Sequence, residues 1–144
     1  MENIVVSACL LGENCKYNGG NNLCSELVKL RDKYNLIPIC PETFGGLKSP
    51  REPAEIFGNR ILLKSGEDVT SEFCKGAKIS LEIAKEHNCK YAILKERSPS
   101  CGVNFIYDGT FSNNIIKGMG ITAKLLSDNC IMLLSENEID SLIK

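Results

Sequence analysis

The sequence has almost no net charge. It contains 17 Lys and Arg residues against 18 Asp and Glu residues, which gives a formal net charge of -1 at pH 7. Nonspecific binding to long nucleic acids depends largely on an excess of Lys and Arg, so this balance argues against such a partner. A small molecule or a single nucleotide is still compatible with it.

The sequence also lacks long apolar runs. No stretch of about 18 uncharged apolar residues occurs, which argues against a membrane partner. The N-terminal residues show no basic region followed by an apolar run and a cleavage pattern, so we expect a cytoplasmic protein. A length of 144 residues with 43% hydrophobic residues predicts one domain, residues 1–144, with its own core.

Cysteine is abundant, but the usual close pairs are missing. The chain has eight Cys residues and no Cys-x-x-Cys motif, which argues against a thioredoxin-type redox pair and a zinc ribbon. In a reducing compartment, thiols more often serve metals or catalysis than disulfides. The single histidine, His87, is expected at a helix end, and we assign it no chemistry.

The pattern of apolar residues predicts an α/β fold. We expect a three-layer, Rossmann-like arrangement: a mostly parallel sheet flanked by helices, with a small hairpin insertion that extends one edge of the sheet. The predicted strands are 4–6, 36–39, 91–94 and 131–134, and the predicted helices are 21–34 (capped by Asn21 or Asn22), 70–88 (capped by Thr70), 121–128 and 137–143. A hairpin is predicted at 55–57 with 60–63, and a short hairpin or a lid at 104–107 with 110–111. A loop rich in Pro and Gly is predicted at 40–53.

Four cysteines fall on loops that follow predicted strands, and these loops should meet at one edge of a parallel sheet. They are Cys9, Cys15, Cys40 and Cys101, whereas Cys24, Cys74, Cys89 and Cys130 fall at core or strand-entry positions. Clustered thiolates are typical ligands of soft metals. Four such ligands would form a closed structural zinc site, and three would hold an iron–sulfur cluster with one open iron.

The neighbours of these cysteines indicate chemistry as well as structure. Glu42 follows Cys40 closely, and Ser98 and Ser100 precede Cys101. A carboxylate and hydroxyls of this kind suit a catalytic base and a hydrogen-bond donor, which a structural zinc site does not need.

Five motifs in this order resemble the thiouracil desulfidase (TudS) family, over nearly the whole chain. They are Ser7-Ala8-Cys9-Leu10-Leu11-Gly12 with Cys15, Cys40-Pro41-Glu42-x-x-Gly45-Gly46-Leu47, Pro50-Arg51-x-Pro53-x-Glu55, Ser98-Pro99-Ser100-Cys101-Gly102, and Gly118-x-Gly120-x-Thr122-Ala123-x-Leu125-Leu126. The resemblance implies a [4Fe-4S] cluster that only three cysteines hold. It also implies a reaction without redox change, in which the fourth iron takes sulfur from a thiolated pyrimidine.

Carried onto this chain, the resemblance implies Cys9, Cys40 and Cys101 as the cluster ligands. Cys15 becomes a further site residue and a reserve ligand. Relatives often have Arg-Tyr-Asp where this chain has Lys16-Tyr17-Asn18, so no role that needs a bidentate guanidinium or a carboxylate is assigned there.

The expected reaction is hydrolytic cleavage of a C–S bond. Glu42 would take a proton from water, Ser100 with Ser98 would donate a hydrogen bond, and sulfide would leave on the open iron. The substrate would be thiouracil, 4-thiouridine or 4-thio-UMP, and the protein either a monomer or a homodimer.

A substrate phosphate has candidate ligands of its own. Arg51, Lys16 and the helix start at Gly120 and Thr122 could bind it, which favours 4-thio-UMP over the free base. In the plainer interpretation, Arg51 braces its loop against Glu52 or Glu55, and Thr122 is an ordinary helix cap. Gly118-x-Gly120 lacks the third glycine of a dinucleotide-binding motif, so NAD is not expected.

Two hypotheses of other classes stay open at this point. In one, Cys9, Cys15, Cys40 and Cys101 form a closed zinc site in a binding module, and the protein is colourless. In the other, Cys9 and Cys15 form the active site of a thiol redox enzyme or persulfide carrier that remains active after chelation.

Overall fold

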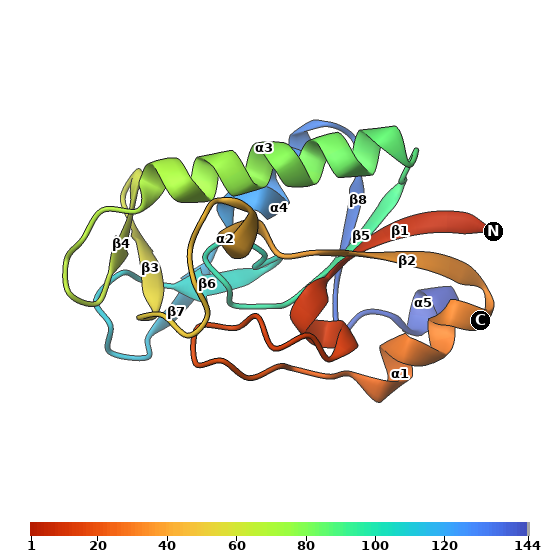
Figure 1. The fold of residues 1–144 in the computed structure, drawn as a ribbon, viewed down its shortest axis with the longest axis horizontal. Helices are drawn as coiled ribbons and strands as arrows, with labels where there is room; N and C mark the ends of the chain where they lie inside the picture. The colour runs from red at the N-terminus through yellow and green to blue at the C-terminus, as the bar shows by residue number, and fades with distance from the viewer. Residues whose placement is uncertain (144) are drawn as a thin grey trace.

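A parallel sheet of four strands forms the centre of the computed structural model, which describes residues 1–143 (Figure 1). Its strands are β1 (Glu2–Ser7), β2 (Tyr34–Ile39), β5 (Tyr91–Leu94) and β8 (Met132–Ser135), in the order β2-β1-β5-β8. Val5, Val6 and Ile93 are fully buried, as expected for strands covered on both faces. The predicted α/β fold with a mostly parallel sheet is confirmed.

Helices cover both faces of this sheet (Figure 1). The helices α3 (Thr70–Glu86) and α4 (Ile121–Asp128) lie on one face, where Val5, Ala92 and Leu94 pack with Ala84 and Leu126. On the other face lie α1 (Ser25–Val28), the 3-10 helix η2 (Lys29–Asp32) and α5 (Asp140–Ile143). The short elements η1 (Ala8–Leu11) and α2 (Pro41–Phe44) follow β1 and β2 directly. No helix among residues 1–143 is both long and apolar enough to cross a membrane.

Two hairpins lie beside the sheet rather than in it. The first pairs β3 (Ala54–Phe57) with β4 (Arg60–Leu63), and the second pairs β6 (Phe105–Tyr107) with β7 (Ile115–Lys117). The prediction that the first hairpin extends an edge of the central sheet was therefore wrong. The second hairpin returns at 115–117 instead of 110–111, because Asp108 and Asn114 close a longer loop through a backbone hydrogen bond.

Several predicted helix boundaries were also wrong. The helix predicted from residue 21 begins at Ser25, because Leu23 is 58% exposed and offers no buried face there, and Tyr34 already belongs to β2. Thr70 does not cap α3: its hydroxyl accepts a hydrogen bond from the N–H of Ile61 on β4. The C-terminal helix starts at Asp140 rather than at 137.

Candidate functional site

A cavity of about 550 Å³ opens at the carboxyl edge of the parallel sheet. The strand order reverses direction at β1, between β2 and β5, and such switch points are where α/β sheets bind ligands. Among the residues that line the cavity are the four cysteines predicted to meet there, Cys9, Cys15, Cys40 and Cys101. The other four cysteines do not line it; Cys89 is buried and Cys130 is exposed.

Three of these cysteines lie in segments that follow neighbouring strands. Cys9 lies in η1, which follows β1 in the sequence. Cys40 lies between β2 and α2, and Cys101 lies in the loop that follows β5. Pro41 at the first position of α2 fits this start, because a helix needs no N–H there and proline presets φ. Cys15 lies in the irregular segment between η1 and α1.

The thiols have different environments. A hydrogen bond with Cys15 lowers the pKa of Cys40 to about 6, and the same contact raises the pKa of Cys15. Burial raises the pKa of Cys101 to about 12. Burial also raises the pKa of Cys9, although the amide Nδ2 of Asn22 offsets this by donating to its Sγ at 3.4 Å. Of the four thiols that line the cavity, Cys40 is therefore the one whose pKa is lowered.

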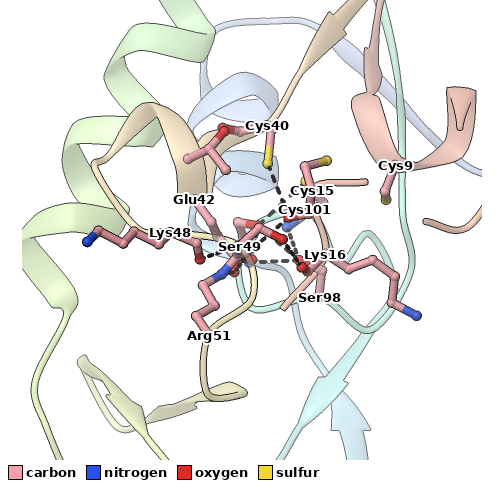
Figure 2. A network of polar contacts seen from close by, with 12 residues as sticks. Cys9, Cys15, Lys16, Cys40, Glu42, Lys48, Ser49, Arg51, Ser98 and Cys101 are labelled. Carbon is pink, nitrogen blue, oxygen red and sulfur yellow. Dashed lines mark hydrogen bonds and ion pairs between the residues drawn. The ribbon is translucent and has the colours of Figure 1, made fainter. Parts of the chain in front are cut away.

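Glu42 is held from two sides (Figure 2). Its Oε1 accepts hydrogen bonds from Nε and Nη2 of Arg51, at 3.0 and 2.9 Å, and its Oε2 accepts one from the Ser100 hydroxyl at 2.9 Å. The Arg51 and Glu42 side chains are only 9% and 15% exposed. A buried carboxylate paired in this way keeps a fixed orientation toward the cavity.

Arg51 also donates two hydrogen bonds to the backbone. Nη2 donates to the carbonyl of Cys15 at 3.0 Å, and Nη1 donates to that of Lys48 at 2.9 Å. Arg51 thus ties the Cys15 loop to Glu42. Bracing was one of the two expectations for this residue, but the acid is Glu42 rather than Glu52 or Glu55.

Ser98 orders the turn that carries Cys101. Its hydroxyl accepts from the backbone N–H groups of Ser100 and Cys101, at 3.2 and 3.1 Å, and lies 2.9 Å from the Ser100 hydroxyl. Ser100 Oγ lies 3.6 Å from the Cys101 sulfur. The two serines therefore connect Glu42 with a cysteine of the site.

The predicted phosphate seat at the start of α4 is wrong. The N–H groups of Gly120, Ile121 and Thr122 donate to the carbonyls of Gly102, Pro99 and Ser100, and Thr122 is fully buried. A Cβ at Gly120 would lie 2.4 Å from the Ser100 carbonyl carbon. Gly120 lets α4 pack against the peptide between Ser100 and Cys101. The N-terminus of α4 therefore does not face the cavity, whose lining includes neither Gly120 nor Thr122.

Lys16 does line the cavity, as predicted for a ligand of the substrate. Its ammonium group lies 5.9 Å from the centre of the Tyr17 ring, and in Figure 2 it points away from the Glu42–Arg51 pair.

Other residues of the cavity were not predicted. Asn22, expected as a helix cap, contacts Cys9, and the hairpins contribute Glu55, Lys64, Tyr107 and Phe111. The hairpins were visible in the sequence, but no local pattern places a hairpin over the end of a distant sheet. The sequence did offer one signal for Asn22. The Oδ1 of Asn21 accepts a hydrogen bond from the Leu23 N–H, so the neighbouring Asn22 is left for another role.

The thiols do not converge on a point. Within residues 1–143, no three His, Cys, Asp or Glu side chains are grouped so that they could hold a single metal ion. The four cysteines instead surround a space that is larger than one ion.

Comparisons with known proteins agree on the family. A solved structure of a [4Fe-4S]-dependent thiouracil desulfidase, TudS, is similar to this chain with a TM-score of 0.94 and 39% identity, covering 99% of this chain and 96% of that one. An uncharacterized protein, YbbK, of Bacillus subtilis (strain 168) is 45% identical over 97% of this chain and 99% of its own length. The model of the 2-thiouracil desulfurase family matches residues 4–138, and the chain belongs to that family.

Proposed function

We propose that this protein is a [4Fe-4S]-dependent desulfidase that removes sulfur from thiolated pyrimidines by hydrolysis, without redox change. The observation that carries the proposal is the shared cavity. Cys9, Cys40 and Cys101 reach it from the ends of three adjacent strands, and the Glu42–Ser100 pair lies in its wall.

The donor set suits an iron–sulfur cluster. Cysteine thiolates are the usual ligands of a cubane, each binding a different iron, so the ligands surround a body wider than one ion. Three thiols on separate elements around one cavity fit this requirement better than the tight tetrahedron of a zinc site. When bound, the cluster supplies an iron that binds the sulfur of the thiocarbonyl group and polarises its bond to carbon.

Glu42 and its neighbours then handle water and protons. Arg51 occupies Oε1 of Glu42, so Oε2 is the atom that takes a proton from the attacking water, directly or through the Ser100 hydroxyl. The water oxygen forms a bond to the ring carbon as the C–S bond breaks. The thiocarbonyl compound and water thus become the carbonyl compound and hydrogen sulfide, with no change in oxidation state.

Cations around the cavity favour a substrate with a phosphate. Lys16, Lys64 and Arg97 line it, and Lys64 and Arg97 are exposed. A nucleoside monophosphate bound with its base inside would present its anion to such groups. We therefore propose 4-thio-UMP ahead of 4-thiouridine and thiouracil, with these residues in place of Arg51, Gly120 and Thr122.

Anaerobic purification with an absorption spectrum, iron and sulfide analysis, and a sulfide-release assay tests the function. We expect a brown protein that contains iron and sulfide and releases sulfide from 4-thio-UMP faster than from 4-thiouracil. A colourless zinc protein, or activity that survives chelation, would overturn the proposal. Equal rates with and without the phosphate would refute only the substrate preference.

Single Cys→Ser variants test the ligand assignment. Cys9→Ser, Cys40→Ser and Cys101→Ser are expected to lose the cluster absorption, whereas Cys15→Ser keeps it. The exposed Cys130→Ser serves as the control. Cluster loss in Cys15→Ser with retention in one of the other three would make Cys15 a ligand.

A further inference from the structure

The loop between β6 and β7 forms one wall of the cavity. Tyr107 at the end of β6 and Phe111 and Asn113 in the loop line it. Figure 1 shows the β6–β7 hairpin next to β3, on the side of the molecule away from the chain termini. Tyr107, Phe111 and Asn113 belong to none of the five family motifs.

Glu55 fastens the loop to β3. Glu55 is only 9% exposed. Its Oε1 accepts hydrogen bonds from the N–H groups of Gly109 and Phe111, at 3.0 and 3.1 Å. A Cβ at Gly109 would lie 2.7 Å from the carbonyl oxygen of Ile56, so the loop backbone packs directly on the strand. The carboxylate is thus satisfied by backbone N–H groups of the loop that it holds.

The loop holds Phe111 in an unfavourable backbone conformation. Phe111 has φ of 57°, in the left-handed region that residues with a bulky side chain seldom adopt. Asn113, a residue type that tolerates this region, has φ of 63°. Asp108 stabilises the approach to Phe111, because its Oδ1 accepts from the N–H and the hydroxyl of Thr110. Backbone strain of this kind persists where the surroundings enforce it, and it is frequent at ligand-binding sites.

We propose that Phe111 stacks on the pyrimidine ring of the substrate and that Glu55 is the positioning residue that holds it there. This inference rests on the proposed function and adds a specificity determinant to it. Three aromatic residues line the cavity, Tyr17, Tyr107 and Phe111, and the first two carry a hydroxyl group. A flat heterocycle there needs an apolar surface, and the ring of Phe111 is an aromatic surface without a polar group.

Kinetics and product binding together test this role. We compare Phe111→Leu, Phe111→Tyr and Glu55→Ala with wild type, measuring kcat and KM for 4-thiouracil and the dissociation constant of uracil for the cluster-loaded protein. Stacking acts on bound substrate and transition state alike, so its loss raises KM and leaves kcat nearly unchanged. We expect KM and the uracil dissociation constant to rise about tenfold in Phe111→Leu and Glu55→Ala and to stay near wild type in Phe111→Tyr.

Phe105→Leu is the matched control. Phe105 lies on the same hairpin, is 42% exposed and does not line the cavity, so its substitution should leave both constants unchanged. Unchanged constants in Phe111→Leu, or equal effects in Phe105→Leu, would overturn the stacking role. If Glu55→Ala alone binds like wild type, the positioning role of Glu55 is refuted.

The two proposals can fail separately. If wild type releases no sulfide from any thiopyrimidine, the proposed function fails. The uracil dissociation constants of wild type and Phe111→Leu then still test the stacking role of Phe111. Wild type that does not bind uracil would overturn the stacking proposal. Active wild type with a Phe111→Leu variant of equal KM would refute the stacking alone.

Discussion

At the scale of single residues, the site depends on how Glu42 is held. Both carboxylate oxygens have assigned partners, Arg51 on one and Ser100 on the other. The arginine keeps the side chain in place, and the serine links it to the turn of Cys101. In the proposed mechanism, a carboxylate oriented in this way would receive the proton without first reorganising.

Replacing Glu42 by Gln should separate catalysis from cluster binding. Gln is similar in size but cannot accept a proton, so turnover should fall about 10²-fold or more while iron content and absorption stay at the wild-type level. Sulfide-release rates on matched iron concentrations measure this. Glu26→Gln, an exposed substitution on α1, is the control. Full activity of Glu42→Gln would remove Glu42 from the mechanism.

Arg51→Lys should weaken the site although the charge is kept. Lysine cannot donate two hydrogen bonds to Oε1 of Glu42 and also reach the Cys15 and Lys48 carbonyls. Because the pair is largely buried, we expect a loss of stability of about 1–2 kcal/mol, below the cost of removing the charge altogether, and at least about tenfold slower turnover.

Arg60→Lys provides the contrast for this prediction. Arg60 pairs with Asp68 across 3.1 Å, but the two side chains are 63% and 41% exposed, so the change should be nearly neutral. Thermal melts of both variants give the comparison. Equal small effects would mean that Arg51 needs only its charge.

At the scale of elements, two glycines bring α2 against α3. A Cβ at Gly76 of α3 would lie 1.7 Å from the carbonyl oxygen of Pro41, and one at Gly45 would lie 1.9 Å from that of Glu72. Backbone therefore meets backbone at this crossing. Since α2 begins next to Cys40 and includes Glu42, the crossing fixes the position of both.

Gly76→Ala should damage the site in spite of helix propensity. Alanine favours a helix over glycine by about 1 kcal/mol, but the added methyl group meets a backbone carbonyl that cannot turn away. We expect a net loss of about 1–3 kcal/mol together with reduced cluster content. Lys75→Ala, on the same helix but exposed, should keep the cluster. Higher stability with a full cluster in Gly76→Ala would contradict this account.

Glu96 organises the loop behind β5. Its Oε1 accepts from the N–H groups of Val103, Asn104 and Phe105 at 2.8 to 3.0 Å. Burial acts to raise the pKa of Glu96, but these hydrogen bonds outweigh it and the pKa is lowered. The loop that carries Cys101 is thus closed around an ionised carboxylate.

The lowered pKa of Glu96 gives stability a pH dependence of known sign. The contribution is fully present above the ordinary glutamate pKa of about 4.3 and is lost as the pH falls through the lower pKa of the folded state. Glu96→Gln should therefore lower stability at pH 7 by about 2 kcal/mol, with the gap to wild type closing below about pH 4. Melting curves of both proteins from pH 7 to pH 3 test this. A constant gap would refute it.

The sequence was sufficient to predict the parallel sheet and the position of four cysteines at one edge of it. Apolar runs such as 4–6 and 91–94 can be read locally, and parallel strands end at one edge, so Cys9 and Cys101 had to approach each other. The partner of Arg51 could not be read in this way, because three acids lie within reach along the chain. The Gly76 contact and the Phe111 wall depend on the docking of distant elements, for which a single sequence carries no signal.

At the scale of the whole molecule, the cavity and the core are built from different groups. The sheet is buried between apolar side chains on both faces, with Ile4, Val5, Ala92 and Leu94 fully covered. The four cysteines of the cavity lie after the ends of the strands, outside the central sheet. The packing of the sheet therefore does not depend on contacts with a cluster. The fold should therefore exist before the cluster is inserted.

Removing the cluster by anaerobic chelation should lower the melting temperature and leave the secondary structure intact. A ligand that binds only the folded chain adds about 3 kcal/mol once it is about 100-fold above its dissociation constant, which corresponds to about 5–10 °C for a domain of this size. Far-ultraviolet circular dichroism before and after chelation, with thermal melts of both forms, measures the two effects. Because Cys130 lies outside the cavity, the Cys130→Ser protein should respond as wild type does. A chain that loses its helical signal on chelation would show that the cluster, and not the packed sheet, holds the three strand ends together.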